Sequence, residues 1–119
     1  MEGGENMDLM AQLNQLLKQL NASVKELRTT GTAYAQAEHD YKISVTKKAL
    51  ELRANGSPVS LINTTIYGYA DIAKLRFERD VAETVYKANL EAINSVKLQL
   101  RLIEGQLSRE FADAERLHS

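Results

Sequence analysis

Asn55-Gly56-Ser57-Pro58 interrupts a chain that otherwise permits a helix at every position, and this break decides the fold. Pro58 is the only proline among the 119 residues, and proline is the residue that a helix interior tolerates least. Gly56 can take the left-handed conformation that ends many helices, while Ser57 and Pro58 suit the start of a new one. The sequence therefore predicts a helix over 7–55, a tip helix over 57–67 and a second long helix over 70–116.

Apolar residues recur along both long segments with the 3-4 spacing of helices that pack lengthwise. We call the expected contact stripe the seam. On the first helix it comprises Leu13, Leu20, Leu27, Tyr34, Tyr41 and Lys48, together with Leu17, Val24, Gly31, Glu38, Val45 and Leu52. On the second it comprises Ile72, Arg79, Tyr86, Ile93, Leu100 and Leu107, together with Leu75, Ala82, Asn89, Val96, Ile103 and Glu110. Two such seams predict an all-α, coiled-coil-like antiparallel helical hairpin with a short helix at its tip.

Folding the chain back at the break predicts which seam residues face each other. The expected pairs are Leu52 with Ile72, Val45 with Arg79, Glu38 with Tyr86, Gly31 with Ile93, Val24 with Leu100 and Leu17 with Leu107. Small Gly31 then opposes a large side chain, which favours an intramolecular hairpin over two unrelated coils. The tip helix is expected to cover three apolar residues that lie off the seam, Ile43, Leu50 and Phe77.

Composition narrows the class of protein. The net charge of −1 indicates no global attraction to nucleic acid or to an anionic membrane. The absence of cysteine excludes a disulfide scaffold, an iron–sulfur cluster and thiolate-ligated zinc, and it fits a cytoplasmic protein. No apolar run approaches the ~18 residues of a membrane span. Residues 1–6 are expected to form a disordered leader before a single domain over 7–116.

The second long helix carries more apolar residues than one seam needs. Each buried Leu or Ile contributes about 1.5–3 kcal/mol, whereas ordering the chain costs about 1–2 kcal/mol per residue, so a two-helix hairpin is marginally stable. A second face therefore predicts a partner. We expect a homo-oligomer, most simply a dimer forming a helical bundle, or a different protein bound to the same face. The residues of this partner face are Phe77, Val81, Val85, Leu98 and Leu102.

Several seam residues near the middle of the hairpin are polar. This polar core layer consists of Tyr34, Glu38, Tyr41, Tyr86 and Asn89. One interpretation is a pocket that holds a small ligand in the core of a bundle. The other, which we favour, is that buried polar groups fix the alignment of the helices at some cost in stability.

Metal binding and catalysis find little support in the sequence. Three consecutive helical residues point about 100° apart, so Glu38-His39-Asp40 cannot chelate one ion together. The only other histidine is His118, and no His-x3-His or Glu-x2-His pair occurs. The sequence also lacks nucleophile and phosphate-binding motifs. We therefore expect no metal, no cofactor, no catalytic residues and no enzymatic activity.

The tip of the hairpin is predicted to be basic. Between residues 41 and 79 three residues are acidic, Glu51, Asp71 and Glu78, whereas seven are basic: Lys42, Lys47, Lys48, Arg53, Lys74, Arg76 and Arg79. With Tyr67 and Tyr69 expected to be exposed, this end could contact nucleic-acid phosphate or an acidic protein surface. A Lys74–Glu78 pair is expected to neutralise part of the charge.

Four short stretches carry a resemblance to small helical proteins encoded in the early regions of phages and prophages of Gram-positive bacteria. They are Gln36-Ala37-Glu38-His39-Asp40-Tyr41-Lys42, Gly56-Ser57-Pro58-Val59, Arg79-Asp80-Val81-Ala82-Glu83 and Ser108-Arg109-Glu110-Phe111. The resemblance implies an accessory protein of the host cytoplasm, near genes that serve recombination, replication or interference with host defences. It carries over no functional residues.

Three functions are therefore to be distinguished. The leading hypothesis is a non-enzymatic accessory protein that binds a host or phage protein. The second is a nucleic-acid-binding protein that uses the basic tip. The third is a ligand-holding helical bundle that uses the polar core layer.

Overall fold

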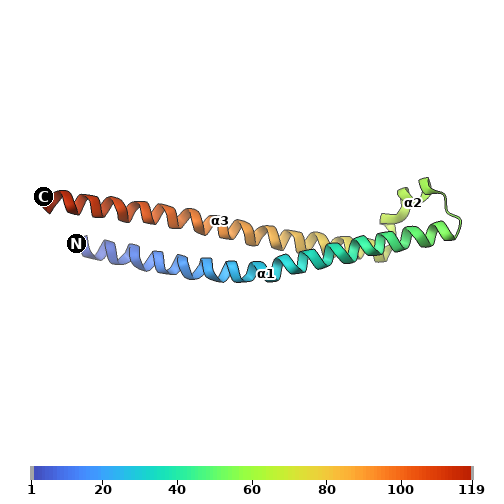
Figure 1. The fold of residues 1–119 in the computed structure, drawn as a ribbon, viewed down its shortest axis with the longest axis horizontal. Coiled ribbons are helices and arrows are strands. Elements are labelled where there is room, and N and C mark those ends of the chain that lie inside the picture. The colour runs from blue at the N-terminus through green and yellow to red at the C-terminus, as the bar shows by residue number, and fades with distance from the viewer. Residues whose placement is uncertain (1, 119) are drawn as a thin grey trace. The chain divides into compact units, whose positions relative to one another are not determined.

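The computed structural model describes residues 2–118, with the side chains of residues 8–117, and over this range the chain is built from helices (Figure 1). Helix α1 spans Glu2–Ala54, α2 spans Val59–Thr65, the 3₁₀ helix η1 spans Ile66–Gly68 and α3 spans Ala70–His118. The predicted all-α hairpin is confirmed.

The ends of the two long helices differ from the expected ones. Helix α1 begins at Glu2 and so includes residues 2–6, where a disordered leader was expected, while Met1 lies outside the described residues. Helix α3 begins at the expected residue and continues two residues beyond 116.

The break between α1 and α2 ends the first helix as predicted. The amide of Ser57 donates to the carbonyl of Leu52 and that of Gly56 to the carbonyl of Arg53, each at 3.0 Å, which is the Schellman arrangement. Gly56 has a φ of 91°, in the region that favours glycine. Helix α2 begins one residue later than expected. Pro58 is its N-cap, in extended conformation, and Val59 is its first helical residue. The predicted tip helix over 57–67 is therefore the shorter α2 followed by η1.

Two glycine-to-alanine substitutions should change stability in opposite directions. Gly56→Ala should lower the free energy of unfolding by about 1 kcal/mol, because a Cβ is strained at positive φ. Gly105→Ala should raise it by about 1 kcal/mol, because alanine suits a helix interior better and its Cβ would lie at an ordinary 3.7 Å from Nη1 of Arg109. Urea unfolding followed by circular dichroism measures both, and changes of the same sign would contradict the assignment.

The chain divides into two compact units, which we describe separately. The tip unit is Arg28–Ala88, and the terminal unit comprises the described parts of Met1–Leu27 and Asn89–Ser119. Each unit contains one part of α1 and one part of α3. The single domain expected over 7–116 stays a prediction.

The terminal unit is held together by an aliphatic core between α1 and α3. Leu16, Val96 and Leu100 are buried in one cluster, with Leu13, Leu20 and Ile103 packed against it. Leu100 therefore lies in the cluster of Leu16 and not with Val24, and Nδ2 of Asn89 reaches the carbonyl of Ser23, so the expected register was wrong by at least two helical turns in this unit.

One of the two seam sets predicted for α1 was also wrong in the terminal unit. Leu17 and Val24 are 41% and 49% exposed, whereas Leu16 is buried and Ser23 is half-buried. The buried position that follows Leu13 is thus Leu16, three residues later, and not Leu17, four residues later. Both spacings occur in a helical seam, and the neighbouring pair Leu16-Leu17 offers an apolar residue at either. Only the partner helix decides between them.

In the tip unit the register differs by about one turn from the expected one. Nζ of Lys48 lies 3.2 Å from Oδ2 of Asp71, so the start of α3 is level with Lys48, not with Leu52. The guanidinium of Arg79 lies over the ring of Tyr41, not beside Val45. The cause is the path of residues 55–69, which form two short helices and not a tight turn. The first residues of α3 therefore lie beside Lys48, and the last residues of α1 extend past them.

The best-buried side chains of the described chain belong to the tip unit: Ile72 is 1% exposed, Ile66 3% and Ile62 4%. They come from α3, η1 and α2, and we infer that they form one small core. The expected cover over Ile43, Leu50 and Phe77 was wrong, because these are 40%, 66% and 68% exposed. Helix α2 buries Ile62 and η1 buries Ile66, whereas Ile43, Leu50 and Phe77 stay exposed and are not covered by the described residues of the tip.

The seam predicted for α3 is confirmed in both units. Its twelve residues are all buried or half-buried, from Ile72 to Glu110. The stripe keeps its 3-4 spacing along the whole of α3, which is why the sequence identified it, and the further apolar residues of this helix form the exposed partner face.

Candidate functional site

The tip unit brings two members of the predicted polar core layer into ring contact. The rings of Tyr34 and Tyr86 have centroids 5.8 Å apart and planes inclined by 33°. Tyr86 also fills the space beside Gly31, since a Cβ at Gly31 would lie 3.4 Å from the tyrosine ring. Gly31 therefore makes room for Tyr86 and not, as expected, for Ile93.

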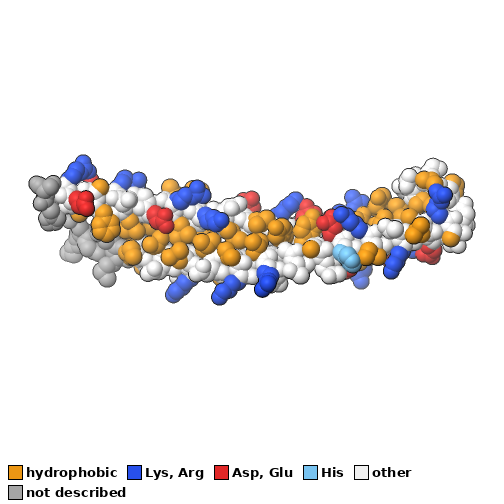
Figure 2. All heavy atoms as spheres, viewed as in Figure 1, with side chains coloured by type: hydrophobic (Ala, Val, Ile, Leu, Met, Phe, Trp, Pro, Cys, Tyr) orange, Lys and Arg blue, Asp and Glu red, His pale blue; other side chains and the backbone are white. Residues whose placement is uncertain are grey.

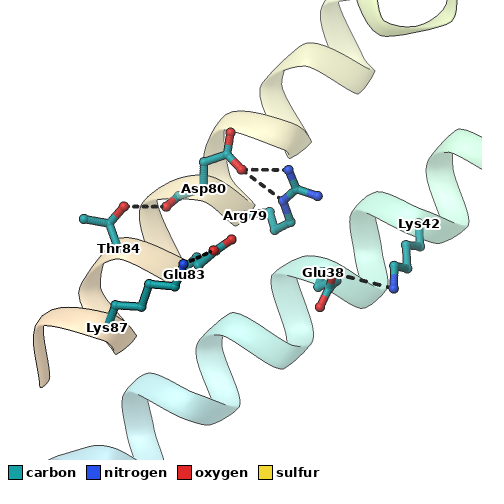
Figure 3. Close-up of polar contacts among 7 residues, drawn as sticks. All are labelled: Glu38, Lys42, Arg79, Asp80, Glu83, Thr84 and Lys87. Atoms are coloured by element: carbon teal, nitrogen blue, oxygen red, sulfur yellow. Dashed lines mark hydrogen bonds and ion pairs between the residues drawn. The ribbon is translucent and has the colours of Figure 1, made fainter. Parts of the chain in front are cut away.

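The hydroxyl of Tyr34 donates a hydrogen bond to Glu83, a residue of α3 that the sequence reasoning did not place in the layer. Glu83 also forms an ion pair with Lys87, in which Nζ of Lys87 lies 2.7 Å from Oε1 of Glu83 (Figure 3). The hydrogen bond from Lys87, its charge and the hydrogen bond from Tyr34 lower the pKa of Glu83. The pKa of Tyr34 is raised, first by its burial and then by the negative charges of Glu38 and Glu83. The i,i+4 spacing of Glu83 and Lys87 is the signal that could have identified this pair.

Glu38 and Tyr41, the other two members on α1, have different partners. Glu38 lies 3.5 Å from Nζ of Lys42, one turn along the same helix, and is partly exposed (Figure 3). Tyr41 is buried, with the guanidinium of Arg79 4.7 Å above its ring. Arg79 donates from Nε and Nη2 to Oδ1 of Asp80, at 3.0 and 2.8 Å, and this carboxylate raises the pKa of Arg79. Arg79 thus forms its ion pair with Asp80, the next residue along α3.

Asn89, the fifth predicted member, belongs to the terminal unit. Its side chain is buried and Nδ2 donates to the backbone carbonyl of Ser23 at 3.0 Å. A side-chain bond to the backbone of the opposite helix requires one alignment of the two helices. This contact supports the interpretation that the polar residues fix register.

Within the layer, each carboxylate lies beside a cation or a donor. Glu38 has Lys42, Glu83 has Lys87 and Tyr34, and among side chains 8–117 no buried polar atom lacks a hydrogen-bond partner. Such pairing is typical of a structural cluster, because it leaves the charges neutralised and held in place.

The carboxylate of Glu83 should make stability depend on pH. Because its pKa is lower in the folded chain than in the unfolded chain, it stabilises the fold above the unfolded pKa, and this contribution is lost as the pH falls through the folded pKa. Glu83→Gln should therefore destabilise the chain at neutral pH, and the difference from wild type should shrink below about pH 4. Thermal unfolding across this pH range measures it.

Glu91→Gln is the matched control for the pH experiment, because Glu91 is exposed on the same helix and makes no ion pair with the side chains of residues 8–117. It should differ little from wild type throughout the range. An equal response of the two variants would show that Glu83 has no special role.

The triplet at 38–40 has local partners. Nδ1 of His39 lies 3.2 Å from Oδ1 of Asp40, which also accepts from Nε2 of Gln36 at 2.9 Å. Among the residues whose side chains are described, no three His, Cys, Asp or Glu groups are placed to hold a metal ion.

Part of the predicted basic tip is engaged in contacts of its own. Lys42 pairs with Glu38, Lys48 with Asp71, and Arg79 with Asp80. The hydrogen bond from Lys48 is the main cause of the lowered pKa of Asp71. The remaining four cations make no ion pair within the described range: Lys47, Arg53, Lys74 and Arg76. The expected Lys74–Glu78 pair is therefore not formed.

The predicted partner face on α3 is exposed along its whole length. In the tip unit Phe77, Val81 and Val85 are 68%, 46% and 50% exposed, and in the terminal unit Leu98 and Leu102 are 55% and 63% exposed. Phe77, Val81 and Val85 are spaced by four residues and so share one face of the helix. Figure 2 shows, on the face that it draws, exposed hydrophobic side chains and projecting Lys and Arg side chains.

Within the described range, none of the helices combines the length and the apolar character that crossing a membrane requires. Comparison of the chain with protein-family models, with curated proteins and with solved structures finds no match.

Proposed function

We propose that this chain is a non-enzymatic accessory protein that acts by binding other protein chains, and that its first partner is a second copy of itself. The observation that carries the proposal is the exposed apolar face of α3, with Phe77 68% and Val81 46% exposed. Contiguous apolar patches of this kind mark interaction sites on protein surfaces.

The energetics of the hairpin favour a second copy as the occupant. Each long helix buries one seam, and at the break only three isoleucines are almost fully buried. A pair of helices with one seam is marginal, whereas a four-helix arrangement would bury the outer face of α3 as well. A dimer formed through this face would be symmetric, with the same residues contributed by each chain.

The resemblance to phage and prophage accessory proteins suggests a wider setting for the proposal. In that setting the dimer would act in the cytoplasm of a bacterial host, on a host or phage protein. The polar core layer would then serve the alignment of the helices and not a ligand, which agrees with the ring contact of Tyr34 and Tyr86 and with the bond of Asn89 to Ser23.

Sedimentation equilibrium tests the dimer directly. We expect the apparent mass to rise from that of one chain toward that of two as the concentration is raised from low micromolar to submillimolar. A constant mass of 13.3 kDa over this range would overturn the proposal.

A further inference from the structure

Two tyrosine rings at the tip are both exposed and accompanied by cations. Tyr67 is 48% exposed in η1 and Tyr69 is 37% exposed directly after it. The guanidinium of Arg76 lies 5.6 Å from the ring centre of Tyr67, and Nζ of Lys48 lies 4.9 Å from that of Tyr69. A cation over one face of a ring holds the ring in place and leaves its other face for a planar group.

The space beside Tyr69 is open and lined by small side chains. An open hollow of about 340 Å³ is bordered by Thr64, Thr65, Gly68 and Tyr69. The two threonine hydroxyls donate to backbone carbonyls of α2, each at 2.8 Å, so their oxygens can still accept hydrogen bonds from a ligand. The ring of Tyr69 is therefore accessible from this side to a flat, polar molecule.

The same part of the chain has an excess of positive charge. Between residues 41 and 79 seven residues are basic and three are acidic, and one of the acidic ones, Asp71, is bound to Lys48. Lys47, Lys74 and Arg76 are exposed and form no ion pair with the described acidic side chains. A polyanion would thus meet cations that need not first leave an internal ion pair, although Arg76 also lies over the ring of Tyr67.

From these observations we propose that the tip unit binds single-stranded nucleic acid. Its phosphates would contact Lys47, Lys74 and Arg76, and its bases would stack on Tyr67 and Tyr69. Proteins that bind single-stranded nucleic acid combine exposed aromatic rings with cations, because the unpaired bases are free to stack on the rings. A duplex or an acidic protein would use the charges but leave the two rings without a role. This function would operate beside the protein–protein contact of α3.

Fluorescence anisotropy with labelled oligothymidylate tests the proposal, with a DNA duplex and polyglutamate as the other two probes. We expect the single strand to bind more tightly than either, with an affinity that falls as salt is added. Tyr67→Ala should weaken binding about tenfold and Tyr67→Phe should leave it unchanged, because stacking needs the ring and not the hydroxyl. Arg76→Gln should reduce the slope of log affinity against log salt by about 0.7.

Arg101→Gln is the matched control, since Arg101 is an exposed arginine of the same helix in the terminal unit, and it should bind as wild type. Far-UV circular dichroism confirms that each variant keeps its helices. The proposal fails if oligothymidylate does not bind at low salt, if Tyr67→Ala binds as tightly as Tyr67→Phe, or if polyglutamate binds as tightly as the single strand. The last result would point to an acidic protein as the partner of the tip.

Discussion

Replacing Ile72 by alanine is expected to lower the free energy of unfolding by about 3 kcal/mol, the largest loss that we expect from a single truncation in this chain. Ile72 is 1% exposed, more deeply buried than any other described side chain, and it lies at the start of α3. Truncation removes the transfer energy of three carbon atoms and leaves a cavity where α2, η1 and α3 meet. Urea unfolding followed at the helix band of circular dichroism measures the loss.

Leu50→Ala provides the control for this prediction. Leu50 is also a large aliphatic residue of the tip unit, but it is 66% exposed on the outer face of α1. Its truncation should change the free energy of unfolding by no more than about 0.5 kcal/mol. Equal losses in the two variants would mean that Ile62, Ile66 and Ile72 do not form the core of the tip.

Phe77→Glu is expected to weaken self-association of the chain by at least about a hundredfold, which corresponds to about 2.7 kcal/mol. The ring of Phe77 is 68% exposed in the single chain, so glutamate there costs the hairpin little. In a dimer formed through this face, the same change removes a buried aromatic ring and puts an unpaired charge in its place. Sedimentation equilibrium gives the dissociation constant.

Two further variants make this result specific. Leu50→Glu changes an equally exposed apolar residue on α1 and should leave the dimer intact. Leu102→Glu tests the part of the partner face that lies in the terminal unit, where Leu102 is 63% exposed. If Leu50→Glu dissociates the dimer and Phe77→Glu does not, the copies meet through α1 and the assignment of the partner face to α3 is wrong.

The candidate site was predicted in part. Tyr34 and Tyr86 were expected in one layer and do lie in ring contact, because both belong to seam positions that the heptad spacing identifies. Glu83 was missed because it lies one position beyond the seam residue Ala82, where its side chain is only half-buried. Whether Tyr34 could reach it depends on register, which the heptad spacing leaves open.

The sequence by itself determined the helices, the break between them and the seam of α3. These are local properties: one glycine at positive φ ends the first helix, one proline precedes the next helix, and an apolar stripe at 3-4 spacing defines a buried face. Only the tertiary structure decided the register, and with it the partners of Lys48, Arg79 and Tyr86. The reason is that many registers satisfy a repeating seam, and in the tip unit the choice among them depends on how much length Asn55-Gly56-Ser57-Pro58 and the helices that follow take up before α3 begins.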